Sequence, residues 1–315
     1  MTPRSRPLTR PLSRHLIQPV ATSTIAEYYD QTDSSYEHWG NDGAYELHYG
    51  YYECEATAPG DLADGDLGAG ATFRESHGRA LRRMNRALAD AVAVNAEDRV
   101  LDAGCGVGGS SLWLAEHRGC RVHGISLSEV QVDKARGFAA QLGEVSERLR
   151  FSIRDFTATG FRDASFDVVW ALESSSHADS SRRFLEEAYR LLRPGGRLVI
   201  GDFFLTREPT SDIERYSLRR WLSGWAMPGL LTVDGVVQEL ETVGFQTPEA
   251  FDITDRIRPS AEEIYRRGRD GYPGDIMEKG KNVLQIQHVE ACLFQKICLD
   301  QGLWRYRIQT ARKPV

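Results

Sequence analysis

The sequence predicts an α/β fold with a largely parallel sheet, and three observations support this prediction. Short apolar segments alternate with segments of helical periodicity from about residue 96 onward, as in strands joined by helices. Val168–Leu172 is a near-continuous apolar run, as a parallel strand covered on both faces requires. A glycine-dense turn over residues 104–109 follows a short apolar run, so a ligand-binding turn is expected at the carboxyl end of a strand.

Length and composition narrow the class of protein. The 315 residues suffice for one large or two modest domains with an ample core. The formal net charge of −6 argues against general attraction to nucleic acid. Five cysteines without a Cys-x-x-Cys pair favour reduced thiols over a disulfide framework or a zinc site. We therefore expect a cytoplasmic enzyme with no metal-ligand set of its own, no nucleic-acid partner and no integral membrane segment, since no apolar run approaches about 20 residues.

Residues 1–22 are a basic stretch in which arginines and prolines alternate. This stretch lacks the apolar core of a secretory signal. We expect a disordered basic arm, and an arm that docks on a neighbouring subunit is the alternative. This arm and the segment over residues 23–95 together favour a homo-oligomer.

Residues 23–95 are predicted to form a helical cap that precedes the sheet. Tyr and Trp residues are dense between positions 28 and 52, either as the core of a helix hairpin or as a lid with aromatic faces. Residues 55–72, rich in Gly, Asp and Ala, predict a loop. Apolar residues at helical spacing predict a helix over 73–94.

The glycine-dense turn begins after the short apolar run that ends at Leu101. Glycines let the backbone turn sharply and approach a ligand, and the helix predicted from Ser110 points its free N–H groups into the same space. Asp102 precedes the first glycine, and no phosphate-binding Lys-Ser/Thr pair follows. A carboxylate at this point would repel a pyrophosphate and suits an ammonium group.

The run Leu-Asp-Ala-Gly-Cys-Gly-Val-Gly-Gly over 101–109 resembles the first motif of class I S-adenosylmethionine (SAM) methyltransferases. In that family the motif cradles the methionine end of SAM. The resemblance therefore implies SAM as the cofactor, with contacts from Asp102, Gly104, Cys105 and Gly106.

Three later segments extend the resemblance. Gly-Ile-Ser-Leu-Ser-x-x-Gln over 124–131 is similar to the tocopherol, sterol and cyclopropane-synthase branch, although Ser126 replaces the acidic residue that usually binds ribose. The branch implies ribose contacts from Ser126, Leu127 and Gln131. Asp155-Phe156 resembles the adenine clamp of the family, and a turn aspartate beside a core Phe is the alternative. Leu-Leu-Arg-Pro-Gly-Gly-x-Leu over 191–198 is a further motif of the superfamily.

The resemblance implies a seven-stranded Rossmann-like sheet in a methyltransferase domain over 96–315. It also implies an N-terminal helical lid and helices inserted after the fifth strand, over about 203–233 and 256–300. Tyr-Tyr-Asp at 28–30 and the later His-Tyr-Gly-Tyr-Tyr at 48–52 resemble the cap of tocopherol, sterol and isoprenoid C-methyltransferases. Within this cap, Tyr29 is the expected cofactor contact.

Periodicity and turn residues predict the remaining elements. The predicted strands cover residues 121–126, 151–156, 166–172, 198–201, 245–254 and 303–310. Helices are predicted over 182–192, 234–243 and 285–299. Ser-Ala-Glu-Glu at 260–263 fits a capping box that opens a further helix.

Glu173 directly follows the apolar run of the fourth strand and is expected at the mouth of the sheet. A Glu in an apolar pocket has a raised pKa and is a better base near neutral pH. In geranyl diphosphate C-methyltransferases and their relatives, a glutamate at the end of this strand is the proposed base, and Glu173 in Ala-Leu-Glu-Ser matches it. A structural hydrogen bond is the alternative. His177 has three alternative roles: a second base, a hydrogen-bond donor to a phosphate, or a packing residue.

Aromatic side chains suit a reaction that passes through a carbocation, because ring faces attract cations. The candidate substrate contacts of this kind, together with one histidine, are Tyr28, Trp39, His48, Tyr51, Phe203, Phe204, Trp221 and Trp225. Arg256 and Arg258 lead a run of C-terminal basic residues that could bind a diphosphate, which would bring Mg²⁺. A solvated helix face is the alternative for this basic run.

The sequence therefore predicts a SAM-dependent C-methyltransferase that acts on an alkene carbon of a small isoprenoid, and we expect a prenyl diphosphate. The alternative within enzymes is methylation of C, N or O in an aromatic or other specialised metabolite. A SAM-binding scaffold without chemistry is the alternative from another class.

Overall fold

The computed structural model describes residues 22–36, 45–53, 73–278 and 283–315. Three of the predictions above concern segments outside these ranges: all but the last residue of the arm 1–22, Trp39, and the loop 55–72. In the described ranges, no helix is long and apolar enough to cross a membrane.

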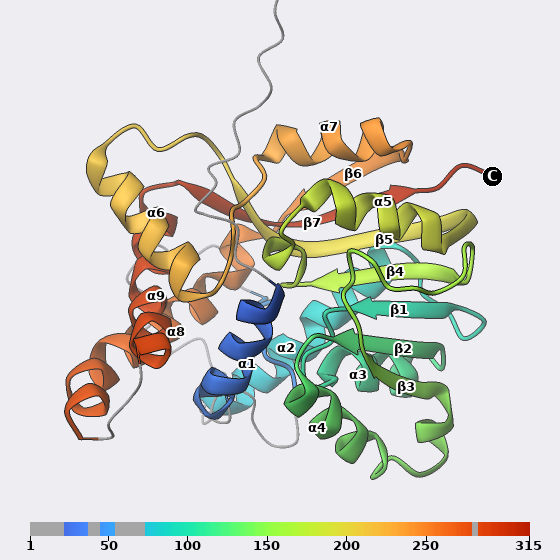
Figure 1. Cartoon of the computed structure of the whole chain (residues 1–315), viewed down its shortest axis with the longest axis horizontal. Helices are drawn as coiled ribbons and strands as arrows, with labels where there is room; N and C mark the ends of the chain where they lie inside the picture. The colour runs from blue at the N-terminus through green and yellow to red at the C-terminus, as the bar shows by residue number, and fades with distance from the viewer. Residues whose placement is uncertain (1–21, 37–44, 54–72, 279–282) are drawn as a thin grey trace, which may run out of the picture.

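Seven strands form one sheet in the order β3-β2-β1-β4-β5-β7-β6 (Figure 1). The first five strands pair in parallel, and β7 runs antiparallel to both of its neighbours. The strands are β1 (Arg99–Ala103), β2 (Arg121–Ser126), β3 (Leu149–Ile153), β4 (Phe166–Leu172), β5 (Leu192–Leu205), β6 (Gln246–Asp252) and β7 (Trp304–Arg312). This arrangement confirms the predicted seven-stranded, Rossmann-like α/β fold.

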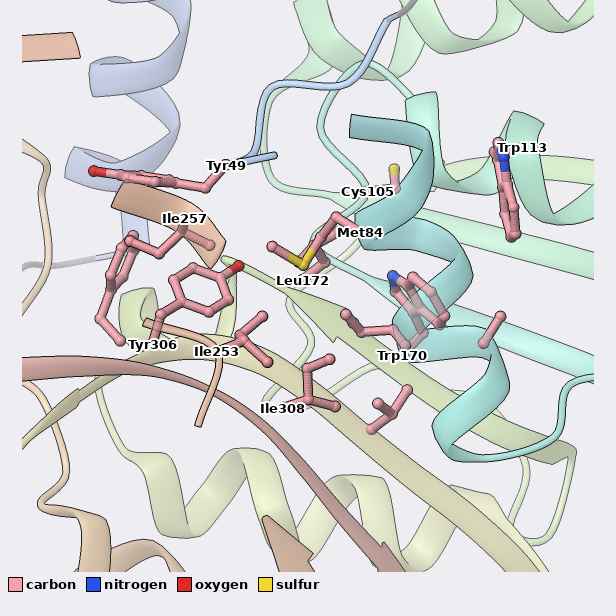
Figure 2. Packing of buried hydrophobic residues seen from close by; sticks show 14 of the residues in the cluster. Tyr49, Met84, Cys105, Trp113, Trp170, Leu172, Ile253, Ile257, Tyr306 and Ile308 are labelled. Carbon is pink, nitrogen blue, oxygen red and sulfur yellow. The ribbon is translucent and has the colours of Figure 1, made fainter. Parts of the chain in front are cut away.

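Alternate residues of the strands belong to two separate cores, one on each face of the sheet. On one face, Val168 and Trp170 of β4 pack with α2 (Phe73–Ala91), α3 (Gly109–His117) and α4 (Glu129–Ala139) (Figure 2). On the other face, the intervening residues pack with α5 (Ser181–Leu191) and α7 (Val233–Val243). Both faces of β4 are therefore buried, as its apolar run requires.

A further group of helices lies beyond the carboxyl ends of the parallel strands (Figure 1). It contains α1 (Thr22–Tyr36), α6 (Asp212–Gly224), α8 (Thr254–Glu278) and α9 (Val283–Asp300). Helix α9 packs against the other three. Segments from both ends of the chain thus meet at the edge of the sheet where open α/β sheets bind ligands.

Several element boundaries differ from the prediction, among them the start of β5, which lies at Leu192 rather than at residue 198. Strand β5 continues to Leu205 rather than ending at residue 201, because β7 pairs with it as far as Leu205 and Trp304. Phe203 and Phe204 are therefore strand residues and do not belong to an insertion. Helix α8 begins at Thr254, whose N–H and hydroxyl both donate to Asp252. The predicted capping residue Ser260 lies inside this helix, and its hydroxyl accepts the N–H of Gly50.

Candidate cofactor and acceptor site

A cavity of about 680 Å³ lies at the carboxyl end of the parallel strands. The glycine turn after β1, the start of α4 and the residues after β4 form its sheet side. The cap, including residues 45–49, and the helices α8 and α9 form much of the remainder, and Phe156, Phe203, Trp225 and Met227 complete it. The predicted cofactor motifs and three of the predicted aromatic contacts, Tyr28, Phe203 and Trp225, therefore meet around one space.

The glycine turn requires glycine for two physical reasons. Gly104, Gly106 and Gly108 have φ of 93°, 55° and 92°, in the left-handed region that side chains disfavour. A Cβ on Gly104 would lie 2.4 Å from the Cβ of Ser174, so the turn also packs closely on the residue that follows Glu173. Of the predicted contacts here, Gly104, Cys105 and Gly106 all line the cavity.

Asp102 lines the same part of the cavity and is 2% exposed. Its Oδ2 accepts a 2.6 Å hydrogen bond from Ser111 in the first turn of α3. Burial raises the pKa of this carboxyl to about 7, because the charged form is desolvated. A cationic group in the cavity would restore the ionised form.

The predicted ribose segment lies beside the turn, where Ser126, Leu127 and Gln131 line the cavity. The hydroxyl of Ser126 donates to Oε1 of Gln131 over 2.9 Å, which holds both side chains at the cavity. Ser128 caps α4, and its hydroxyl donates to Asp30 of α1 over 2.5 Å. One hydrogen bond therefore ties the cap to the ribose segment.

Of the predicted adenine clamp, Phe156 lines the cavity and Asp155 does not. Oδ1 of Asp155 accepts the N–H and the hydroxyl of Thr157, at 2.7 and 2.8 Å. Asp155 thus orders the turn after β3.

Glu173 lines the cavity directly after β4. Its φ of 51° is in the left-handed region, an unfavourable conformation for a residue with a side chain. Its Oε1 accepts the N–H of Tyr49 at 2.8 Å and the hydroxyl of Tyr306 at 2.7 Å. Burial raises the pKa of this carboxyl to about 8, these two hydrogen bonds oppose the shift, and the Asp202 charge adds to it.

Two tyrosine–histidine pairs lie on the cap side of the cavity. The hydroxyl of Tyr29 is 2.8 Å from Nε2 of His177, and that of Tyr28 is 2.7 Å from Nδ1 of His288. Burial lowers the pKa of His177 to about 4, so this imidazole is neutral near pH 7. His48 also lines the cavity, and burial lowers its pKa to about 4.

Phe203 is the centre of an aromatic cluster that borders the cavity. Its ring makes edge-to-face contacts with Tyr49, Trp221, Trp304 and Tyr306, at centroid distances of 5.2 to 5.4 Å. Within this cluster Tyr49 and Phe203 line the cavity, as does the neighbouring Trp225, whereas Trp221 lies behind them.

Phe204 is a correction to the predicted contacts. It belongs to the core on the opposite face of the sheet, because successive strand residues point to opposite faces.

Three further predicted contacts lie outside the cavity wall. The Arg256 guanidinium carbon lies 5.8 Å from the centre of the Tyr51 ring, and neither residue lines the cavity. Arg258 contacts Asp255 and Asp300 on the surface. Among the described arginines, Arg267 lines the cavity, and its Nε donates to Glu263 over 2.6 Å.

Sequence reasoning missed the residues that hold Glu173. Tyr49 lies within the quoted aromatic run of the cap, but the donor is its backbone N–H, which no side-chain pattern reveals. Tyr306 alternates with Arg305 and Arg307 on β7, so it could have been recognised as the inward-facing residue of that strand. Its register opposite Phe203 depends on the pairing of β5 with β7.

No group of three or more His, Cys, Asp or Glu side chains in the described ranges could hold a metal ion. These residues therefore do not fit Mg²⁺ held by protein ligands alone.

Comparisons with known proteins agree with this geometry. A family model described as a methyltransferase domain matches residues 101–200. The chain is 32% identical over 282 residues to 27-O-demethylrifamycin SV methyltransferase from Amycolatopsis mediterranei (strain S699), covering 88% of this chain and 91% of that protein.

Two solved structures share the fold. The cyclase SpnF matches with a TM-score of 0.74 at 24% identity and covers 96% of this chain and 100% of its own. Geranyl diphosphate C-methyltransferase from Streptomyces coelicolor A3(2), in complex with Mg²⁺, geranyl diphosphate and S-adenosyl-L-homocysteine, matches with a TM-score of 0.68 at 19% identity. That match covers 94% of this chain and 99% of its own.

Proposed function

Because this chain belongs to the SAM-dependent methyltransferases, we propose that it methylates an alkene carbon of a small isoprenoid, with Glu173 as the base. The observation that carries this proposal is the carboxyl group of Glu173, which Tyr49 and Tyr306 hold at the wall of an aromatic cavity. The cavity is large enough for a cofactor and a small acceptor together.

The residues around the cavity fit SAM. Gly104 to Gly106 and Asp102 would hold the methionine end, while Ser126, Leu127 and Gln131 would hold the ribose and Phe156 the adenine. When bound, SAM supplies an electrophilic methyl group. The protein contributes mainly position and electrostatics to such a transfer.

The aromatic residues and Glu173 act on the acceptor. The π electrons of the alkene would form the new bond to the methyl carbon as the bond from that carbon to the sulfonium sulfur breaks and its electron pair stays on sulfur. The positive charge then lies on the neighbouring carbon of the acceptor as a carbocation. The rings of Tyr49, Phe203 and Trp225 surround this position and stabilise positive charge. The Glu173 carboxylate then takes a proton from an adjacent carbon, and the electron pair of that C–H bond restores the double bond.

The positions of the described arginines give little support for a diphosphate group on the acceptor, so the proposal rests on the hydrocarbon part. Arg267 lines the cavity but already donates to Glu263, and Arg256 and Arg258 lie elsewhere. A diphosphate usually needs several cationic groups or a metal ion. The assay must therefore distinguish recognition of the hydrocarbon chain from recognition of the diphosphate head group.

The test is a transfer assay with methyl-labelled SAM. Isopentenyl, dimethylallyl, geranyl and farnesyl diphosphates are compared with the corresponding alcohols, with and without Mg²⁺. We expect labelled product from one chain length, and we expect Glu173→Gln to lose it. If no isoprenoid in either form is methylated while SAM still binds, the proposal is wrong.

A second candidate is O-methylation of a hydroxyl group, and the Tyr29–His177 pair favours it. His177 is neutral and lies in the cavity, so it could accept the proton of a hydroxyl acceptor. The relative from Amycolatopsis is named for methylation of 27-O-demethylrifamycin SV, a name that indicates an oxygen as the acceptor atom. With such an acceptor, His177→Gln should lose activity and Glu173→Gln should keep most of it, the opposite of the pattern expected for an alkene.

A further inference from the structure

A second acidic residue lies at the cofactor end of the cavity and has no role in the account above. Glu46 belongs to the cap segment 45–53, lines the cavity and is 5% exposed. The backbone of this cap segment packs tightly against the start of α3. A Cβ on Gly109 would lie 2.6 Å from the carbonyl of Tyr45 and 2.7 Å from the backbone N of Glu46. The first turn of α3 and the cap are therefore in direct contact beside this carboxyl group.

The carboxyl group of Glu46 is only half satisfied within the described residues. Its Oε1 accepts a long hydrogen bond of 3.4 Å from Asn85, whose own Oδ1 accepts the hydroxyl of Ser110 at 2.7 Å. Its Oε2 is buried and accepts no hydrogen bond from the part of the chain that the structure describes. Burial raises the pKa of Glu46, and a hydrogen bond with its own backbone N–H, the charge of Arg82 and the hydrogen bond from Asn85 oppose this only in part.

A buried carboxylate with an unsatisfied oxygen is unfavourable unless a cation completes it. Asp102 is linked to α3 in a similar way to Glu46. Asp102 accepts a hydrogen bond from the hydroxyl of Ser111. Glu46 is linked through Asn85 to the hydroxyl of Ser110, the preceding residue of the same helix. Both carboxyl groups line the cavity, and both are tied to the first turn of the same helix. The ammonium group at the methionine end of SAM is a cation that reaches this end of the site.

We propose that Glu46 and Asp102 together hold the ammonium group of SAM, Asp102 from the sheet and Glu46 from the cap. The inference rests on SAM as the cofactor and is independent of the acceptor. It makes Glu46 a cofactor-binding residue contributed by the N-terminal segment, so that cofactor and cap stabilise each other's position.

Calorimetric binding of three ligands to the full chain tests this role. S-adenosylhomocysteine carries both the ammonium and the carboxylate, its decarboxylated form keeps the ammonium, and 5′-methylthioadenosine lacks both. Glu46→Gln should raise the dissociation constants of S-adenosylhomocysteine and of its decarboxylated form by about tenfold or more, since it removes a charge-assisted contact. The dissociation constant of 5′-methylthioadenosine should not change. Glu187→Gln is the control, because Glu187 is a partly buried acid bound to Thr159 and Arg190 outside the cavity.

Two results would overturn the proposal. One is equal affinity of wild type and Glu46→Gln for all three ligands. The other is an equal loss for all three, which indicates a purely structural role. Thermal unfolding without ligand separates a folding defect from a binding defect, and we expect Glu46→Gln to melt no lower than wild type, because the substitution removes an unsatisfied buried carboxylate. Glu46→Asp, which keeps the charge and shortens its reach, should bind with intermediate affinity.

Discussion

At the scale of single residues, opposing influences act on the carboxyl group of Glu173. Burial raises its pKa to about 8, while hydrogen bonds from Tyr306 and the N–H of Tyr49 stabilise the charged form. A base must be ionised to accept a proton. The balance between burial and these two donors therefore sets the pH range in which Glu173 can act.

The turnover number should rise with pH and reach a plateau. The inflection should lie at or below about pH 8, because the positive charge of bound SAM favours the carboxylate further. Steady-state rates across the neutral and mildly alkaline range measure this. Glu173→Gln should be about 100-fold slower or worse and show no such inflection. A wild-type rate that falls as pH rises through this range contradicts the assignment of the base.

Tyr306→Phe tests the donor to this carboxyl group. Loss of the hydroxyl removes a hydrogen bond that favours the charged form, so the inflection should move to higher pH and the rate at neutral pH should fall about tenfold. Tyr189→Phe is the matched control, because Tyr189 packs on Phe245 away from the cavity. An unchanged pH profile in Tyr306→Phe would show that the hydroxyl does not tune Glu173.

At the scale of elements, local pattern predicted the parallel core well. The apolar run of β4 and the glycine turn after β1 are short-range signals, and each lies where expected. The predicted turn over 193–197 instead lies within β5, where the pairing with β4 shifts register. The far end of β5 and the start of α8 could not be predicted in the same way. Strand β5 extends to Leu205 because it pairs with β7, almost 100 residues later in the sequence. Helix α8 begins at Thr254 because the side chain of Asp252 caps it.

The two neighbouring phenylalanines of β5 offer a matched test of the two faces. Phe203→Leu and Phe204→Leu should each lower the free energy of unfolding by about 1 kcal/mol, since both rings are buried in a core. Only Phe203→Leu should raise the KM for the acceptor, because only Phe203 lines the cavity. Urea unfolding and initial rates measure the two effects. A raised KM in Phe204→Leu alone would contradict the assignment of faces.

Two glycines give a comparable test of the turn. Gly104→Ala should lower the free energy of unfolding by about 1–3 kcal/mol and abolish cofactor binding, because φ is 93° and Ser174 occupies the space. Gly137→Ala in α4 meets nothing within 4 Å and has no left-handed φ, so it should stabilise the protein by up to about 1 kcal/mol. Thermal unfolding and S-adenosylhomocysteine titration distinguish the two variants. Equal effects would mean that the turn tolerates a side chain.

At the scale of the whole molecule, the site depends on contacts between distant parts of the chain. The cap contributes Tyr28, Tyr29 and Tyr49, the sheet contributes Glu173, and α9 contributes His288. The residues expected from the glycine turn and the ribose segment, among them Asp102, Gly104 and Ser126, line the cavity, since each motif is continuous in sequence. Arg256 and Arg258, expected from the family resemblance, lie outside it, and His288, which lines it, carried no local signal.

Cofactor binding should therefore stabilise the whole assembly. S-adenosylhomocysteine at 100 times its dissociation constant should add about 2.7 kcal/mol to the free energy of unfolding. Hydrogen exchange should slow in α1 and residues 45–53 as well as around the glycine turn, because all three adjoin the cavity. Slower exchange in the glycine turn alone would indicate that the cap does not respond to the cofactor.

The position of β7 has a consequence for how the molecule assembles during synthesis. The five parallel strands leave the ribosome before β7 and can pair with one another, whereas β6 pairs with β7 alone among the described strands. Until residues 304–312 emerge, Glu173 lacks its hydroxyl partner and the aromatic cluster around Phe203 lacks two of its rings. A nascent chain can thus form the glycine-turn side of its cavity before β7 is translated, while the surroundings of Glu173 and Phe203 are completed only after β7 has followed.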